Sequence, residues 1–175
     1  MPDRQADNRS LNFAGDEDGQ GRPLPMTPEV LRGRTEKWPR SECTPEGVAA
    51  ILARSRQMFI DGYYTYENFM DAATRSLQAV EAALRVHFDA GEAVSFARLI
   101  KRAKSEGLVD DYTCEVLNAG RELRNTFVHT TSTPALNPAI AARIIGASHL
   151  LVSEMFGENR GGPEKGPTAG EQAQP

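Results

Sequence analysis

One long apolar stripe constrains the fold of this chain more than any other feature of its sequence. Between Tyr63 and Phe88, apolar side chains recur every three or four residues for about seven turns, and the stripe ends at Asp89-Ala90-Gly91. Spacing of this kind places the apolar side chains on one face of a helix. A helix that long has to bury its apolar face against other elements, so it predicts a packed helical domain.

Four further segments show the same helical period. They cover about residues 46–61, 95–107, 111–127 and 138–156. Each has a start or stop signal, including Thr44-Pro45-Glu46, Ser95, Gly107 and Asn137-Pro138. Asp110 or Asp111 is expected to cap the fourth helix. No strand-like alternation runs for more than a few residues. The fold class predicted is therefore all-α, a bundle of about five helices with antiparallel neighbours.

Composition separates this domain from its flanks. Of the 11 prolines and 15 glycines, nine of each fall in residues 1–45 or 157–175, which hold only two of the 12 aromatic residues, Phe13 and Trp38. We therefore predict a helical domain over 46–156, with a disordered or loosely attached N-terminal tail at 1–45 and a disordered C-terminal tail at 157–175. Trp38 is the side chain in the N-terminal tail that could dock onto the domain.

Several functional classes are disfavoured at the same stage. No apolar run approaches the roughly 20 residues of a membrane helix, and no secretory signal is visible at the N-terminus. Cys43 and Cys114 are isolated from each other and from histidine, so we expect no disulfide framework, no metal site and a reducing cytoplasm. The net charge of −4 argues against general nucleic-acid coating, although a local basic cluster could still bind RNA.

The candidate chemistry lies at the end of the fourth predicted helix. Arg121, Asn125 and His129 are spaced four residues apart and share a polar flank of that helix, whereas Arg124 lies five positions before His129, about 140° around the axis. Spacing alone also allows a solvated helix face without a function. For His87 and His149, a surface or partly packed role is expected.

Arg124-Asn125, three residues and His129 resemble the R-x(4–6)-H signature of the HEPN domains, the higher-eukaryote and prokaryote nucleotide-binding superfamily. The layout is similar too: Met58–Tyr64, Ser76–Arg85 and Leu99–Leu108 precede the motif, and the resemblance covers about residues 46–156. It implies a HEPN-like bundle and a metal-independent, cofactor-free ribonuclease. Many members of the family are toxins or antiviral-defence effectors that dimerise so that two motifs form one cleft.

On that resemblance, His129 acts as general acid or base, Arg124 stabilises the scissile phosphate and Asn125 orients one of them. The product is a 2′,3′-cyclic phosphate, and the expected partners are RNA, a second copy of the chain and an antitoxin or defence-system protein. In one prokaryotic branch, a tyrosine two residues after the histidine is modified by the antitoxin. Thr130-Thr131 follow His129 here, so that regulation is not expected.

Two other uses of the same fold stay open from the sequence. One is a non-catalytic HEPN module that binds RNA or a nucleotide, or dimerises, and the other is a structural bundle whose tails recruit partners. The third predicted helix carries four basic residues on one face: Arg98, Lys101, Arg102 and Lys104. Together with Arg121 of the fourth helix, they are expected either to bind RNA or to form an ordinary solvated face. Glu81 is expected to form a structural salt bridge, with Arg85 or an arginine of the fourth helix.

Overall fold

The structure, a computed structural model, describes residues 4–128 and 136–157, and for residues 123–128 it describes the backbone. Its main body is five helices: α2 (Glu46–Asp61), α3 (Asn68–His87), α4 (Phe96–Ser105), α5 (Asp111–Val128) and α6 (Pro138–Met155). The predicted all-α class is therefore confirmed for the main body. No helix in the described ranges is both long and apolar enough to cross a membrane.

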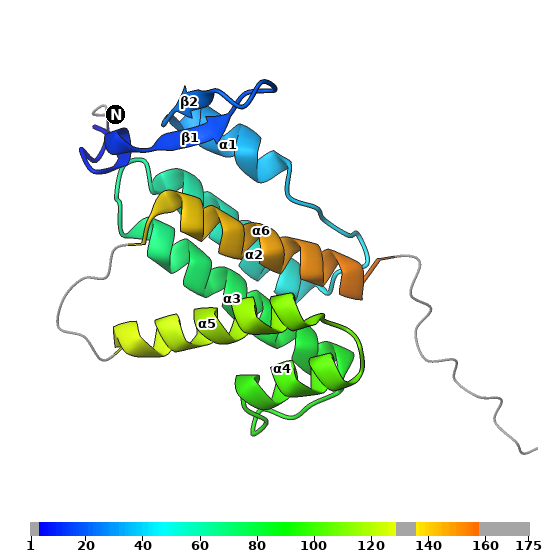
Figure 1. Ribbon diagram of the computed structural model, residues 1–175. Helices are drawn as coiled ribbons and strands as arrows, with labels where there is room; N and C mark the ends of the chain where they lie inside the picture. The colour runs from blue at the N-terminus through cyan, green and yellow to red at the C-terminus, as the bar shows by residue number, and fades with distance from the viewer. Residues whose placement is uncertain (1–3, 129–135, 158–175) are drawn as a thin grey trace, which may run out of the picture.

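Helix α3 is the centre of the bundle because it contacts all four of the other main helices. In Figure 1, α2 and α6 lie along one side of α3, and α4 and α5 lie on the opposite side. The predicted stripe is the reason: Phe69, Leu77, Val80 and Leu84 are almost completely buried. Glu81 forms the expected ion pair with Arg85 at 2.7 Å, and both side chains are half-buried.

The long stripe is interrupted at its start. Residues 62–67 form a turn between α2 and α3, so Tyr63 and Tyr66 precede the helix instead of lying within it. Gly62 is required at this turn, because a Cβ there would lie 2.6 Å from the ring of the fully buried Phe69. The close approach of α2 and α3 therefore depends on a residue without a side chain.

Most helix ends agree with the signals in the sequence. Asn137 accepts a hydrogen bond from the backbone N–H of Ala139, Asp110 accepts one from Thr113, and Gly107 has a φ of 70° beyond the end of α4. Thr44-Pro45-Glu46 does mark the start of α2, but the N-cap is Pro45 and not the threonine, and no side chain caps the helix. Thr27-Pro28-Glu29 repeats that sequence pattern, and there the threonine does cap a helix, α1 (Pro28–Glu36).

Residues 4–45 differ from the predicted loose tail. They contain a short 3₁₀ turn (Ser10–Asn12), strands β1 (Ala14–Glu17) and β2 (Pro23–Pro25) paired antiparallel, and helix α1, which together cover one end of the bundle (Figure 1). The two-stranded sheet is also an element that the prediction lacked. The predicted C-terminal tail lies, from residue 158 onward, outside the described residues.

The N-terminal segment is held by apolar burial and by polar contacts. Leu31 is fully buried and Met26 nearly so, in a cluster with Phe59, Phe69 and Ile145 of the bundle. Ser10 donates a buried hydrogen bond to the carbonyl of Gly62 at 2.8 Å, and Arg9 pairs with Glu67 at 2.7 Å. The bundle leaves an apolar end that this segment covers, which is why a Pro- and Gly-rich sequence packs there.

Candidate functional site

The three predicted catalytic residues lie at the end of α5. Arg124 and Asn125 are in its last two turns, and His129 follows its final residue, Val128, and lies outside the described residues. The helix is continuous over this stretch, so positions 121 and 125 are one turn apart, as the spacing predicted. Distances between the side chains of these three predicted catalytic residues stay predictions.

Arg121 lies on α5, three residues before Arg124. Its side chain is about a quarter exposed and its Nη2 lies 3.4 Å from the carboxylate of Glu122. Its Nε is buried and has no hydrogen-bond partner among the described groups. The preceding residue, Gly120, packs so tightly on Leu77 of α3 that an added Cβ would lie 2.8 Å from it. Arg121 is therefore held against the bundle, half-buried, one turn before Arg124 and Asn125.

The predicted basic face of α4 consists of four exposed residues, of which two have partners on the protein. Arg102 pairs with Glu106 at 2.7 Å and lies over the ring of Phe88 at 4.3 Å. Lys104 pairs with Asp111 at 3.0 Å, and the hydrogen bond to that carboxylate raises the pKa of the lysine. Arg98 and Lys101 make no ion pair with any residue of the described ranges, so they are the cations of this face that RNA could use.

The structure separates part of this basic face from the predicted catalytic residues. The ion pair with Asp111 ties Lys104 to the first turn of α5. Arg124 is thirteen residues further along the same helix, roughly 20 Å along its axis. An RNA that contacted both would therefore have to follow α5 over several nucleotides.

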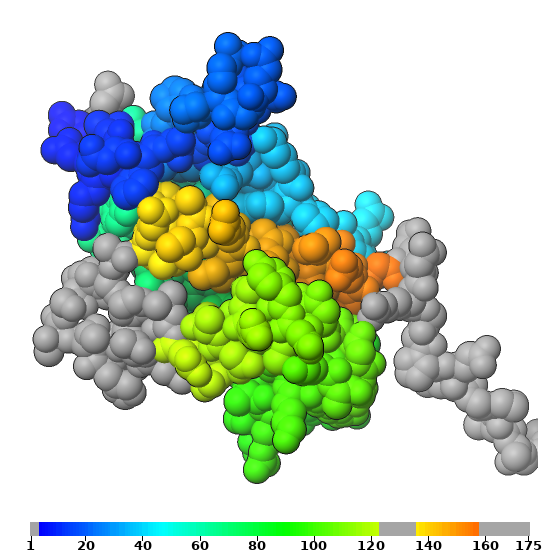
Figure 2. All heavy atoms as spheres, viewed as in Figure 1, coloured from blue at the N-terminus to red at the C-terminus, as the bar shows by residue number. Residues whose placement is uncertain are grey.

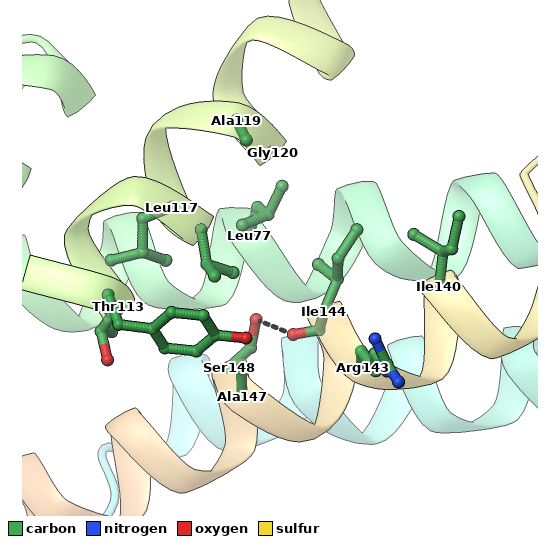
Figure 3. A pocket seen from close by; sticks show the side chains of 12 residues that line it. Leu77, Thr113, Leu117, Ala119, Gly120, Ile140, Arg143, Ile144, Ala147 and Ser148 are labelled. Carbon is green, nitrogen blue, oxygen red and sulfur yellow. Dashed lines mark hydrogen bonds between the residues drawn. The ribbon is translucent and has the colours of Figure 1, made fainter.

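An apolar groove of about 550 Å³ lies between α5 and α6, with α3 as its floor (Figure 3). Leu77, Leu117 and Ile144 line it, Gly120 marks its end nearest Arg124, and Arg143 stands on its α6 side. Around it, Tyr112, Ile140 and Leu150 are about half exposed or more. Figure 2 shows α6 as a strip on the surface between α5 and the N-terminal segment.

His149 differs most from the sequence-based expectation. It was predicted to be on the surface or partly packed, but it is 1% exposed and stacks on Trp38 with ring centroids 5.5 Å apart. Its Nδ1 lies 3.3 Å from the carbonyl of Pro39 and its Nε2 lies 3.4 Å from Arg56. Burial, followed by the positive charge of Arg56, lowers the pKa of His149 to about 4. The helical register of Ile145, His149 and Val152 is the signal that could have shown this burial.

Comparison of the chain with protein-family models, with curated proteins and with solved structures finds no match. Within the described ranges, no three His, Cys, Asp or Glu side chains lie together in a way that could hold a metal ion.

Proposed function

We propose that this protein is a metal-independent endoribonuclease of HEPN type. In this proposal His129 exchanges a proton with the ribose 2′-hydroxyl or the leaving 5′-oxygen, and Arg124 stabilises the charge that accumulates on the phosphate. Asn125 orients one of these two groups. Attack of the 2′-oxygen on phosphorus expels the 5′-oxygen and leaves a 2′,3′-cyclic phosphate, so DNA is not a substrate.

The observation that carries the proposal is the position of the motif in the bundle. Helix α5 is the penultimate helix of the described residues, it contains Arg124 and Asn125, and it ends one residue before His129. This agrees with the motif position in the family that the sequence resembles. Exposed cations support an RNA substrate: Arg98 and Lys101 lie one turn apart on α4 and have no carboxylate partner in the described part of the chain.

A two-fold dimer completes the proposed site, because one histidine per chain can serve as the acid or the base but two are needed for both steps. The apolar face around the α5–α6 groove, defined by Tyr112, Ile140 and Leu150, supports self-association there. Helix α5 contributes both to this face and to the motif. We further propose that an antitoxin or defence-system protein controls the activity in the cell.

The deciding experiment incubates the purified full-length protein with RNA in EDTA and analyses the ends of the products. The expected result is cleavage with 2′,3′-cyclic phosphate ends and no cleavage of DNA of the same sequence. His129→Ala and Arg124→Ala are each expected to reduce the cleavage rate at least about 100-fold, in line with the loss of an acid–base group or a charge-stabilising donor.

Two matched controls lie elsewhere on the bundle. His87 is exposed on α3 and Arg54 is exposed on α2, so His87→Ala and Arg54→Ala are expected to keep the wild-type rate. If wild type and His129→Ala cleave diverse RNAs equally, or neither cleaves any, the catalytic proposal is wrong. The alternative, a non-catalytic RNA- or nucleotide-binding or dimerising module, predicts salt-dependent RNA binding that Arg124→Ala weakens, with no product.

A further inference from the structure

A second cavity, of about 390 Å³, lies away from α5. It is lined by residues 39–42, by helix α2 and by the C-terminal half of α6. Six of the nine residues that line it have polar side chains: Arg40, Ser41, Glu42, Arg56, His149 and Ser153. Cavities of this size are typical of small-molecule sites, in which a few polar groups orient the ligand.

The wall formed by residues 38–42 is fixed to α6. The indole of Trp38 stacks on His149 and crosses the helix at Gly146, where an added Cβ would lie 3.1 Å from its Nε1. At the other end of this wall, Ser41 donates a hydrogen bond to the carbonyl of Phe156 at 2.6 Å. The cavity is therefore formed before any ligand binds.

His149, on the α6 side of the cavity, cannot neutralise a positive charge. The imidazole is neutral near pH 7 because burial lowers the pKa of His149, and Nη1 of Arg56 lies 3.3 Å from its Nδ1 and 3.4 Å from its Nε2. Arg56 therefore donates a hydrogen bond to an uncharged group. Its charge is left without compensation from that contact.

Arg56 is an exception among the half-buried arginines of the described residues. Three of the four pair with a carboxylate: Arg34 with Asp16, Arg85 with Glu81 and Arg121 with Glu122. Arg56 makes no ion pair within the described ranges, and burial together with the like charge of Arg40 lowers its pKa. Two guanidinium groups that line one cavity and form no ion pair there favour the binding of an anion.

We infer that this cavity binds the phosphoryl group of a small phosphate monoester, held between Arg56 and Arg40. A phosphate monoester carries nearly two negative charges at neutral pH, which match the two arginines, and its oxygens accept paired hydrogen bonds from guanidinium groups. The hydroxyl of Ser153 supplies a further donor, and the remaining volume takes the rest of the ligand. This inference does not rest on ribonuclease activity.

Glu42 also lines the cavity, and its carboxylate opposes an anion. It forms no ion pair with Arg40 or Arg56 and it is exposed, so it can turn away when the ligand enters. Glu42→Gln is accordingly expected to tighten binding, since it removes a like charge from the edge of the site.

The test measures binding of adenosine 5′-monophosphate and of inorganic phosphate by isothermal titration calorimetry, at constant ionic strength set with sodium chloride. Adenosine serves as the ligand without a phosphoryl group. Saturable binding of both phosphates and none of adenosine is expected. Arg56→Gln should weaken binding by at least about tenfold, since charged hydrogen bonds are lost.

Arg54→Gln is the matched control, because Arg54 is exposed on the same helix and does not line the cavity. Arg40→Gln provides a second variant at an exposed position if Arg56→Gln unfolds, which circular dichroism will show. The inference is overturned if the phosphates do not bind, if Arg54→Gln and Arg40→Gln weaken binding equally, or if an RNA oligonucleotide without terminal phosphate displaces the monoester. None of these outcomes bears on cleavage by His129, so the two proposals fail separately.

Discussion

Protonation of His149 should destabilise the fold in mildly acidic solution. An ordinary histidine titrates near pH ~6.5, whereas the buried His149 has a pKa of about 4. Between these two values the unfolded chain binds a proton that the folded chain does not. The stability that depends on a neutral His149 is therefore fully present above pH ~6.5 and is lost as the pH falls toward 4. The groups that face the ring, Arg56 on α2 and Arg40 in the N-terminal segment, are both cationic and oppose its protonation.

The magnitude follows from the shift of the pKa. The pKa of His149 is about 2.5 below the ordinary value, which corresponds to a loss of roughly 3 kcal/mol in the free energy of unfolding once the histidine is protonated in both states. About 2 kcal/mol of this loss falls between pH 7 and pH 5. Asp7 and Asp16 have lowered pKa values, so their protonation also destabilises the fold as the pH falls, but only at lower pH than that of His149. The interval between pH 7 and pH 5 therefore reports mainly on histidine.

Urea unfolding of wild type and His149→Phe at pH 7, 6 and 5 measures this effect. Phenylalanine keeps the stack on Trp38 and does not titrate. The free energy of unfolding of His149→Phe should therefore fall by about 2 kcal/mol less than that of wild type between pH 7 and pH 5. His87→Phe changes an exposed histidine and should leave the wild-type pH dependence unaltered. Equal pH dependence in wild type and His149→Phe would refute the reasoning.

Three further predictions test the packing and the proposed dimer. Leu31→Ala should lower the free energy of unfolding in urea by about 2–5 kcal/mol, because Leu31 is fully buried. Arg32→Ala should change it little, because Arg32 is exposed. Equal effects of the two substitutions would mean that α1 is not part of the cooperative unit. Gly62→Ala should destabilise the fold by roughly 1–3 kcal/mol, because its added Cβ clashes with Phe69. Gly33→Ala in α1 should stabilise the fold by up to about 1 kcal/mol, because the space around Gly33 is open. The same shift of the calorimetric melting temperature for both variants would contradict the packing. Ile140→Lys should shift the sedimentation coefficient from that of a dimer toward that of a monomer. Val86→Lys should not, because Val86 is exposed on α3, away from this face. If Ile140→Lys still forms the dimer, the dimer does not use the α5–α6 face.

Much of the bundle could be predicted because its signals are local. The Ser95, Gly107 and Asn137 signals lie at helix ends in the structure, and the α3 stripe is buried as its period required. The hairpin and α1 were missed because proline and glycine outweighed the short apolar pattern in that segment. Thr27-Pro28-Glu29 was nevertheless a usable helix signal. For the candidate catalytic site, the positions of Arg124 and Asn125 on α5 followed from spacing, while the geometry of their side chains with His129 stays a prediction.

The sequence by itself determined that this chain forms amphipathic helices, because a helical period and the residues at helix ends act within a few positions along the backbone. Only the tertiary structure decided that residues 4–45 cover one end of the bundle and that Trp38 buries His149 beside Arg56. These features depend on surfaces contributed by residues about 50 to 115 positions apart. Their stability comes from the apolar area and the charges that meet after folding, which no local pattern in either segment specifies.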